Sequence, residues 1–310
     1  MSVDIPQNMQ ASQTIDAIYK SYIAIHGGEG WRPHLGASRI GEPCRRKLWY
    51  EFRWFLKTQF PGRIHRLFQT GHLEEIRIVQ DLRNAGVEVL DVNPETGEQW
   101  RVQDKDNTFF SGSIDGICHG LLESPTNWHI CEFKTCNDKN YKLLVKKGVK
   151  AHYPMHYAQK QVYMHLFRSP LSFNKRITRT LYVAQNKNDD NLHMERIKYD
   201  EPFAVSLCLK AETIVQSKTA PDREYNSDET FGCRFCDYKD ICWEGSGDIE
   251  KNCRTCKNSS PSTAPEFYCN EFEKYLTVDN QKAGCETGFK PLVNIRSQKP
   301  TSNKLSPFDI

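Results

Sequence analysis

Two carboxylates and a lysine are spaced in a way that suits a hard cation. Asp115 stands at the expected end of a strand, and Glu132-Phe133-Lys134 follows on the next expected strand. Because side chains alternate along a strand, Glu132 and Lys134 share one face while Phe133 points into the core. Mg²⁺ or Mn²⁺ held by such carboxylates polarises a phosphodiester and acidifies an attacking water, and Lys134 could hold that water or meet the developing charge. The alternative is a surface ion pair on an amphipathic strand.

Eight of the twelve cysteines form two sets with metal-ligand spacing. Three of the first set are close together and a fourth candidate lies far upstream: Cys233, Cys236, Cys242 and Cys44. Four thiolates suit a [4Fe–4S] cluster or zinc. The second set is Cys253, Cys256, Cys269 and Cys285. No histidine follows residue 251, so a tetrahedral zinc site there must be all-cysteine.

Other interpretations of the cysteines remain open. The first set could be four free thiols, and Cys253 and Cys256 could bind nothing or extend the first set. The remaining four cysteines are scattered and are predicted to be packing residues: Cys118, Cys131, Cys136 and Cys208.

The charge of +3 is unevenly distributed. Residues 139–188 contain eleven lysines and arginines and no Asp or Glu, which favours a polyanion such as DNA over a merely solvated face. Lys146, Lys147 and Lys150 are predicted to contact DNA. Residues 42–57 mix bases with aromatics and are expected to stack on single-stranded DNA. No eighteen-residue apolar run and no secretory start is visible, which predicts a cytoplasmic protein.

Hydrophobic periodicity predicts a mixed α/β chain. Helices are expected at 11–26, 42–57, 72–84, 139–147, 153–168 and 202–217. Strands are expected at 87–92, 99–102, 108–118, 128–134, 177–185 and 192–199. Leu73, Ile76, Val79 and Leu82 should face inward from the third helix. The predicted units are a core at 1–225, a cluster segment at 226–250, a zinc module at 251–295 and a disordered tail at 296–310.

Several short segments together resemble the PD-(D/E)xK nucleases, and within them the RecB-like branch with an iron–sulfur cluster. This branch includes CRISPR-associated iron–sulfur exonucleases and related phage exonucleases. Gly71-His-Leu-Glu-Glu75 resembles the helical first motif, Asp115 and Glu132-Phe133-Lys134 the central motifs, and Gln159-Lys-Gln-Val-Tyr163 the Gln-x-x-x-Tyr motif. The cysteine pattern of the first set matches too.

The resemblance implies a restriction-endonuclease-like mixed sheet flanked by helices, and a Mg²⁺- or Mn²⁺-dependent DNA exonuclease. The metal ligands would be Glu75, Asp115, Glu132 and the backbone carbonyl of Phe133, with His72 as a rival to Glu75. Gln159 and Tyr163 would support the site and the DNA, with Gln161 competing for the role of Gln159.

The resemblance also implies that the first cysteine set holds [4Fe–4S], while zinc remains the expectation for the second. The enzyme would act on DNA ends in recombination or repair, in a bacterial or phage-infected cell, with a helicase or recombination protein as partner. Two other classes compete: a catalytically silent DNA-binding module of a larger DNA-processing complex, and an electron carrier.

Overall fold

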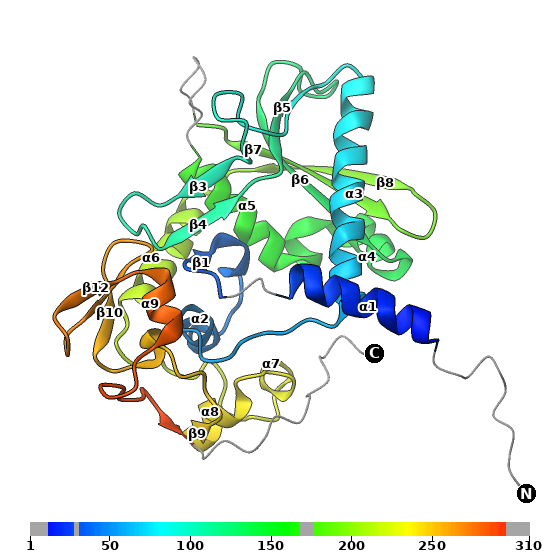
Figure 1. Ribbon diagram of the computed structural model, residues 1–310. Helices are drawn as coiled ribbons and strands as arrows, with labels where there is room; N and C mark the ends of the chain where they lie inside the picture. Colours follow the sequence, from blue (N-terminus) through cyan, green and yellow to red (C-terminus); the bar gives the residue numbers. More distant parts are fainter. Residues whose placement is uncertain (1–11, 28–30, 168–175, 296–310) are drawn as a thin grey trace, which may run out of the picture.

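The computed structural model describes residues 12–27, 31–167 and 176–295 (Figure 1). The predicted tail at 296–310 lies outside the described residues, as do Arg168 and Lys175 of the basic stretch. The helices are α1 (Gln13–His26), η2 (Ala37–Arg39), α2 (Arg45–Phe52), α3 (Gly62–Asn84), α4 (Asp138–His152), α5 (Pro154–Leu166), α6 (Glu201–Gln216), α7 (Phe231–Arg234), α8 (Lys239–Glu244), η3 (Cys253–Thr255) and α9 (Val278–Ala283).

The strands are β1 (Leu35–Gly36), β2 (Glu88–Leu90), β3 (Arg101–Gln103), β4 (Phe110–Ser113), β5 (Gly116–His119), β6 (His129–Cys136), β7 (Arg179–Asn186), β8 (Leu192–Lys198), β9 (Ser246–Gly247), β10 (Ser259–Pro261), β11 (Phe267–Cys269), β12 (Lys274–Leu276) and β13 (Asn294–Ile295). The largest sheet has the order β2-β5-β6-β7-β8. Only β6 and β7 are parallel in it, so the expected mixed sheet is confirmed.

Helices pack on both faces of this sheet. Alternation along β6 sends Cys131 and Phe133 into an apolar cluster with Ile78 and Val79 of α3. Ile130, two residues from Glu132 and on the face opposite Phe133, belongs to the larger core that includes Val162 of α5. The prediction that Phe133 points into the core is thus confirmed, since the side chain is 5% exposed.

The single strand expected at 108–118 is two strands in two different sheets. β4 pairs with β1 and β3 in a small sheet, whereas β5 pairs with β2 and β6 in the large one. Ile114, fully buried, anchors the bend between them, and Asp115 follows it directly. The chain therefore changes sheets at the acid, which a local pattern of apolar residues does not indicate.

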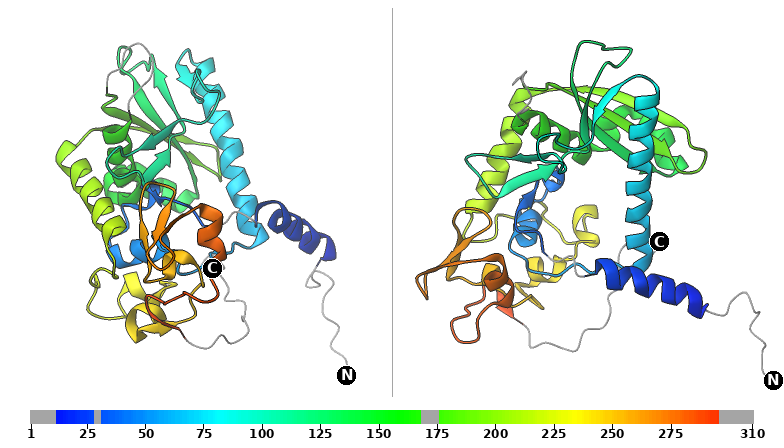
Figure 2. Two further views of the ribbon diagram at one scale, coloured as in Figure 1. Left: turned by 60° about the vertical axis from the view of Figure 1, so that its left-hand side comes forward. Right: turned by 45° about the horizontal axis from the view of Figure 1, so that its top comes forward.

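Helix α3 begins ten residues earlier than the predicted start at 72. Val79 and Leu82 are buried as expected, but Leu73 and Ile76 are 60% and 67% exposed, so their predicted inward orientation is wrong. Figures 1 and 2 show α3 along one side of the molecule, from α1 to the large sheet, and the residues that α3 buries in the apolar cluster on the sheet are Ile78, Val79 and Leu82.

The aromatic and basic segment 42–57 is mostly interior. Its helix, α2, is shorter than predicted, and Trp49, Tyr50 and Phe52 are each no more than 2% exposed. Trp54 and Arg53 are 1% exposed. The expectation that these aromatics stack on DNA is therefore wrong, because they fill the core, where several of them contact one another.

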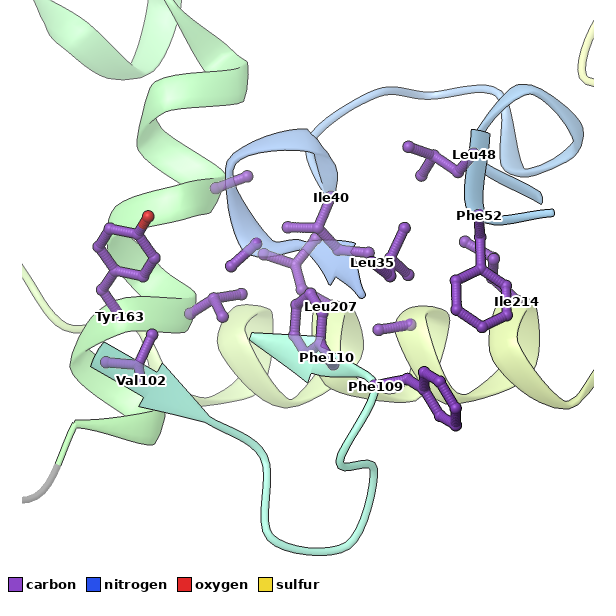
Figure 3. Close-up of a cluster of buried hydrophobic side chains, with 14 of the residues drawn as sticks. Leu35, Ile40, Leu48, Phe52, Val102, Phe109, Phe110, Tyr163, Leu207 and Ile214 are labelled. Carbon is purple, nitrogen blue, oxygen red and sulfur yellow. The ribbon is translucent and has the colours of Figure 1, made fainter. Parts of the chain in front are cut away.

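One continuous core joins the early and late parts of the chain. Figure 3 shows Leu48 and Phe52 of α2 in the same cluster as Phe110 and the α6 residues Leu207 and Ile214. Side chains beyond residue 225 join this core, namely Tyr238, Ile241, Ile249, Cys253, Phe267, Cys269 and Leu276. In the described part of the chain, no helix combines the length and apolarity needed to cross a bilayer.

Arg254 ties the second cysteine set to this core. Its side chain is fully buried, with the guanidinium carbon 3.9 Å from the ring centroid of Trp54 and 4.3 Å from that of Phe267. It donates hydrogen bonds to the carbonyls of Phe52 and Pro33 at 3.1 and 2.9 Å and to the Gln281 side chain at 2.7 Å. Burial, followed by the charge of Arg53, lowers the pKa of Arg254.

Candidate active site

Asp115 is fixed against the strand that carries the other central residues. Its Oδ2 atom accepts a hydrogen bond of 2.9 Å from the backbone N–H of Phe133. Strand pairing explains this contact, because Gly116 lies opposite Cys131 in the antiparallel register of β5 and β6. Lys134 Nζ lies 3.9 Å from the same oxygen. Asp115, Glu132 and Lys134 are thus brought together.

Glu132 is enclosed between two lysines. Its side chain is 1% exposed, Oε1 lies 2.5 Å from Lys134 Nζ, and Oε2 contacts Lys160 Nζ. Lys134 comes from the same strand and is 35% exposed, whereas Lys160 comes from α5 and is fully buried. Lys134 Nζ also donates to the carbonyl of Phe133 at 3.0 Å, so the carbonyl expected to bind metal has a hydrogen-bond partner here.

Glu75 approaches the site from α3. Burial, followed by the negative charge of Asp115, raises the pKa of Glu75 to about 7. An acid destabilised by a neighbouring acid is a frequent arrangement where a cation binds. His72 lies 4.0 Å from Glu75 and its side chain is 78% exposed, against 31% for Glu75. Glu75 is the less exposed of the two rivals, and the negative charge of Asp115 acts on it.

Helix α5 presents a polar row to the same place. Gln159 donates a hydrogen bond of 2.8 Å to the Tyr163 hydroxyl, as the spacing of four residues allows. Gln161 instead donates to the carbonyl of Lys198 and accepts from the backbone of Asp200, so it joins α5 to the start of α6. Of the two competing glutamines, Gln159 is therefore the one paired with Tyr163.

Sequence reasoning missed Lys160 and His156 on this helix. Lys160 is one of the eleven bases of the stretch that favours a polyanion, but it lies within seven consecutive buried residues, 158–164. Burial lowers the pKa of Lys160 to about 7, and the negative charge of Asp115 acts in the opposite direction. His156 lies one turn earlier, and burial, then Lys134, lowers its pKa to about 4. The signal in the sequence that could have indicated burial of Lys160 is its position between two apolar residues of the same helix, Ala158 and Val162.

The basic stretch has an exposed part on α4. Lys146, Lys147 and Lys150 are exposed there, together with Lys139 and Lys142. Glu195 of β8 accepts from the backbone N–H of Val149 at 2.7 Å, just after Gly148 interrupts the helix with φ of 75°. A Cβ at Gly148 would lie 3.3 Å from the Glu195 carboxylate, so this glycine permits both the turn and the contact.

The first cysteine set is assembled from distant parts of the chain. Cys44 precedes α2, while Cys233, Cys236 and Cys242 lie on and between α7 and α8. Burial raises the pKa of Cys236 to about 11, and the negative charge of Cys44 contributes to that rise. Arg46 Nη1 lies 3.8 Å from Cys242 Sγ. Cys44 therefore lies close enough to Cys236 for its charge to act on that thiol, although the two are far apart in sequence.

The second cysteine set surrounds a short hairpin. Cys253 begins η3 and Cys256 follows its end, while Cys269 ends β11, which pairs with β10. The backbone N–H of Lys290 donates to Cys256 Sγ at 3.3 Å. Burial raises the pKa of Cys253 to about 11, followed by the charges of Cys285, Cys269 and Cys256.

The carboxylates and the two cysteine sets have the donor atoms that metal ions require, but not yet the positions. Across residues 12–27, 31–167 and 176–295, no group of three or more His, Cys, Asp or Glu side chains is placed so that it could hold a metal ion. The donor types nevertheless match: three carboxylates for a hard cation and four thiolates in each cysteine set. Glu132 Oε1 is buried without a hydrogen bond of normal geometry. Side chains must therefore turn for a cation to bind.

Several solved structures resemble parts of this chain, although none of the curated proteins matches its sequence. They include an alkaline exonuclease (LHK-Exo) from Laribacter hongkongensis, with TM-score 0.42, 15% identity, and coverage of 63% of this chain and 90% of that one. SSO0001 has TM-score 0.41, 14% identity, and coverage of 75% and 97%. LHK-Exo in complex with dAMP has TM-score 0.38, 14% identity, and coverage of 64% and 90%.

The family assignment depends on the sequence match and not on these structures. The model of the PD-(D/E)XK nuclease superfamily matches residues 32–243. This range spans Glu75, Asp115, Glu132 and Lys134 and ends just beyond Cys242. The chain therefore belongs to the PD-(D/E)XK nuclease superfamily.

Proposed function

We propose that this chain is a metal-dependent deoxyribonuclease that removes nucleotides from DNA ends. One observation carries the proposal: Asp115, Glu132 and Lys134 meet at paired strands, where Asp115 accepts from the backbone of Phe133 and Lys134 contacts both acids. Glu75 comes to them from α3 and is influenced by Asp115. A role in recombination or repair, a helicase partner and a phage origin are supported only by the resemblance of the motifs.

The proposed mechanism assigns each side chain a task. Glu75, Asp115 and Glu132 would hold Mg²⁺ or Mn²⁺, which when bound polarises the phosphodiester and acidifies water. Lys134, partly exposed and within 3.9 Å of Asp115, would hold the attacking water or neutralise charge on the phosphate. Gln159 fixes the hydroxyl of Tyr163 beside the site. The exposed lysines of α4 would bind the phosphate backbone.

The two cysteine sets complete the proposal. Cys44, Cys233, Cys236 and Cys242 would hold one iron–sulfur cluster that ties α2 to α7 and α8. Cys253, Cys256, Cys269 and Cys285 would hold one zinc ion beside the β10–β11 hairpin. Both centres would be structural, because hydrolysis of a phosphodiester transfers no electrons and metal binding adds directly to folding free energy.

The test is digestion of end-labelled single- and double-stranded DNA with Mg²⁺, Mn²⁺ or EDTA. Asp115→Ala and Lys134→Ala should each lower cleavage at least ~100-fold while leaving DNA binding largely intact, because they serve the reaction and not the footprint. The exposed Asp106→Ala and Lys105→Ala variants are matched controls. Full activity of Asp115→Ala, or cleavage in EDTA, would rule out the proposal. DNA binding without cleavage under all conditions would indicate a silent binding module.

A further inference from the structure

Lys160 is an interior charge whose side chain has no access to solvent. The side chains of Lys160 and Glu132 are 0% and 1% exposed to solvent. A charge taken out of water is costly unless an opposite charge compensates it. Lys160 Nζ contacts Glu132 Oε2, and the two charges therefore stabilise each other across the interface of α5 and β6.

The two lysines at Glu132 differ in what else they can reach. Lys134 is 35% exposed and its Nζ also lies near Asp115, so it can meet a substrate. Lys160 is fully enclosed and cannot touch DNA. Each lysine occupies a different oxygen of Glu132, Lys134 at Oε1 and Lys160 at Oε2.

The position of Lys160 is itself fixed by its neighbours. Its Nζ lies 4.5 Å from the ring centroid of Tyr163, a distance at which an ammonium is attracted to the face of an aromatic ring. The Tyr163 hydroxyl is held in turn by Gln159. Gln159 and Tyr163, one turn apart on α5, thus help to position Lys160, and Lys160 in turn contacts Glu132, the candidate metal ligand.

We propose that Lys160 is a positioning residue that holds Oε2 of Glu132, so that Oε1 is the oxygen left for a divalent cation once Lys134 turns away from it. This inference deepens the proposed metal-dependent cleavage and rests on it. Lys160 acts through Glu132 and touches neither DNA nor the reacting atoms. Groups that orient a metal ligand from behind commonly change metal affinity about 10–100-fold when they are removed.

The experiment measures Mn²⁺ affinity of the full-length protein by calorimetry in a double-mutant cycle. Lys160→Met should weaken Mn²⁺ binding about 10–100-fold and leave DNA affinity measured in EDTA unchanged. In a Glu132→Gln background, Lys160→Met should have no further effect on Mn²⁺ affinity, because Lys160 acts only through that carboxylate. Lys105→Met, at an exposed position, is the control and should bind Mn²⁺ like the wild type.

Folding provides a second readout. If Lys160→Met alone fails to fold, the Lys160→Met/Glu132→Gln protein, which neutralises both charges, should recover cooperative melting. Failure of that recovery overturns the pairing. A folded Lys160→Met protein with unchanged or tighter Mn²⁺ binding overturns the positioning role while leaving the nuclease proposal intact. Wild-type protein that binds no Mn²⁺ and cuts no DNA would instead remove the proposed function.

Discussion

Gly112 leaves the space that the ring of Tyr163 occupies. A Cβ at Gly112 would lie 2.8 Å from Cε1 of Tyr163 and 3.0 Å from its hydroxyl oxygen, closer than packed atoms approach. β4 and α5 therefore meet at a point where one strand residue has no side chain. Since Tyr163 packs against Lys160 and bonds to Gln159, this close approach sets the distance between the small sheet and the polar row of α5.

Gly112→Ala should displace Tyr163 and lower both stability and cleavage. Overpacking of this kind costs about 1–3 kcal/mol, and the loss of cleavage should exceed any loss of DNA binding. Chemical denaturation and end-labelled digestion measure the two effects. Combining Gly112→Ala with Tyr163→Leu should cost less stability than the two single changes added together, because the smaller side chain makes room for the methyl group. Strict additivity would mean that the two residues do not compete for space.

Glu75 should make the metal-free protein less stable as pH rises. Its folded pKa, about 7, is above its ordinary value, so the folded state keeps a proton that the unfolded state loses. Stability should therefore fall between about pH 4.5 and 7 and stay constant above that range. Glu75→Gln should remove this fall, with a difference on the order of 1 kcal/mol after allowance for partial exposure. Identical pH profiles of melting temperature in EDTA for both proteins would contradict the assignment.

The lysines of α4 should contribute uniformly to DNA affinity. Replacing Lys146, Lys147 and Lys150 by alanine should weaken binding to every sequence and flatten its salt dependence by about one unit of slope for each phosphate that is no longer neutralised. Fluorescence anisotropy over a range of salt concentrations measures this slope. The control replaces three other exposed lysines, Lys20, Lys105 and Lys282. An unchanged slope in the α4 variant would mean that its lysines only solvate the helix.

The two cysteine sets should lose different metals. Cys44→Ala should lose iron and brown colour and melt at a lower temperature, while about one zinc remains. Closing so long a loop stabilises a chain, by analogy with disulfides, by roughly 2–4 kcal/mol. Cys253→Ala should lose zinc and retain iron. Elemental analysis of anaerobically purified protein provides the measurement. Full iron content in Cys44→Ala, or iron without zinc in the wild type, would place these ligands elsewhere.

Arg254 should be important for stability although it lies far from the acids in sequence. Arg254→Met removes the donors to the buried carbonyl of Phe52 and the partly buried carbonyl of Pro33, and each unpaired buried polar group costs about 1–3 kcal/mol. The free energy of unfolding should fall by about 2–5 kcal/mol, with Lys257→Met, exposed, as control. A decrease as small as that of the control would show that the cysteine-rich segment is not held to the core through this side chain.

Local sequence patterns were sufficient to predict the parts of the site that lie within one strand or one helix. Alternation along β6 put Glu132 and Lys134 on one face and Phe133 on the other. The spacing of four residues allows the pairing of Gln159 with Tyr163 that the resemblance implied, with Gln161 as a rival. These predictions succeed because side-chain direction within one element follows from backbone geometry alone. The same patterns located the main strands and helices, although several of their ends differ in the structure.

Packing between elements determined which faces are covered and which distant groups meet. Leu73 and Ile76 have an inward pattern but lie outside the face of α3 that packs on the sheet through Ile78, Val79 and Leu82. The aromatics of α2 are covered by segments far away in sequence. Lys160 resembles one more surface charge until α5 is laid against β6, where Glu132 compensates it. Burial and charge pairing depend on the element that packs against a face, and a local pattern carries no information about that partner.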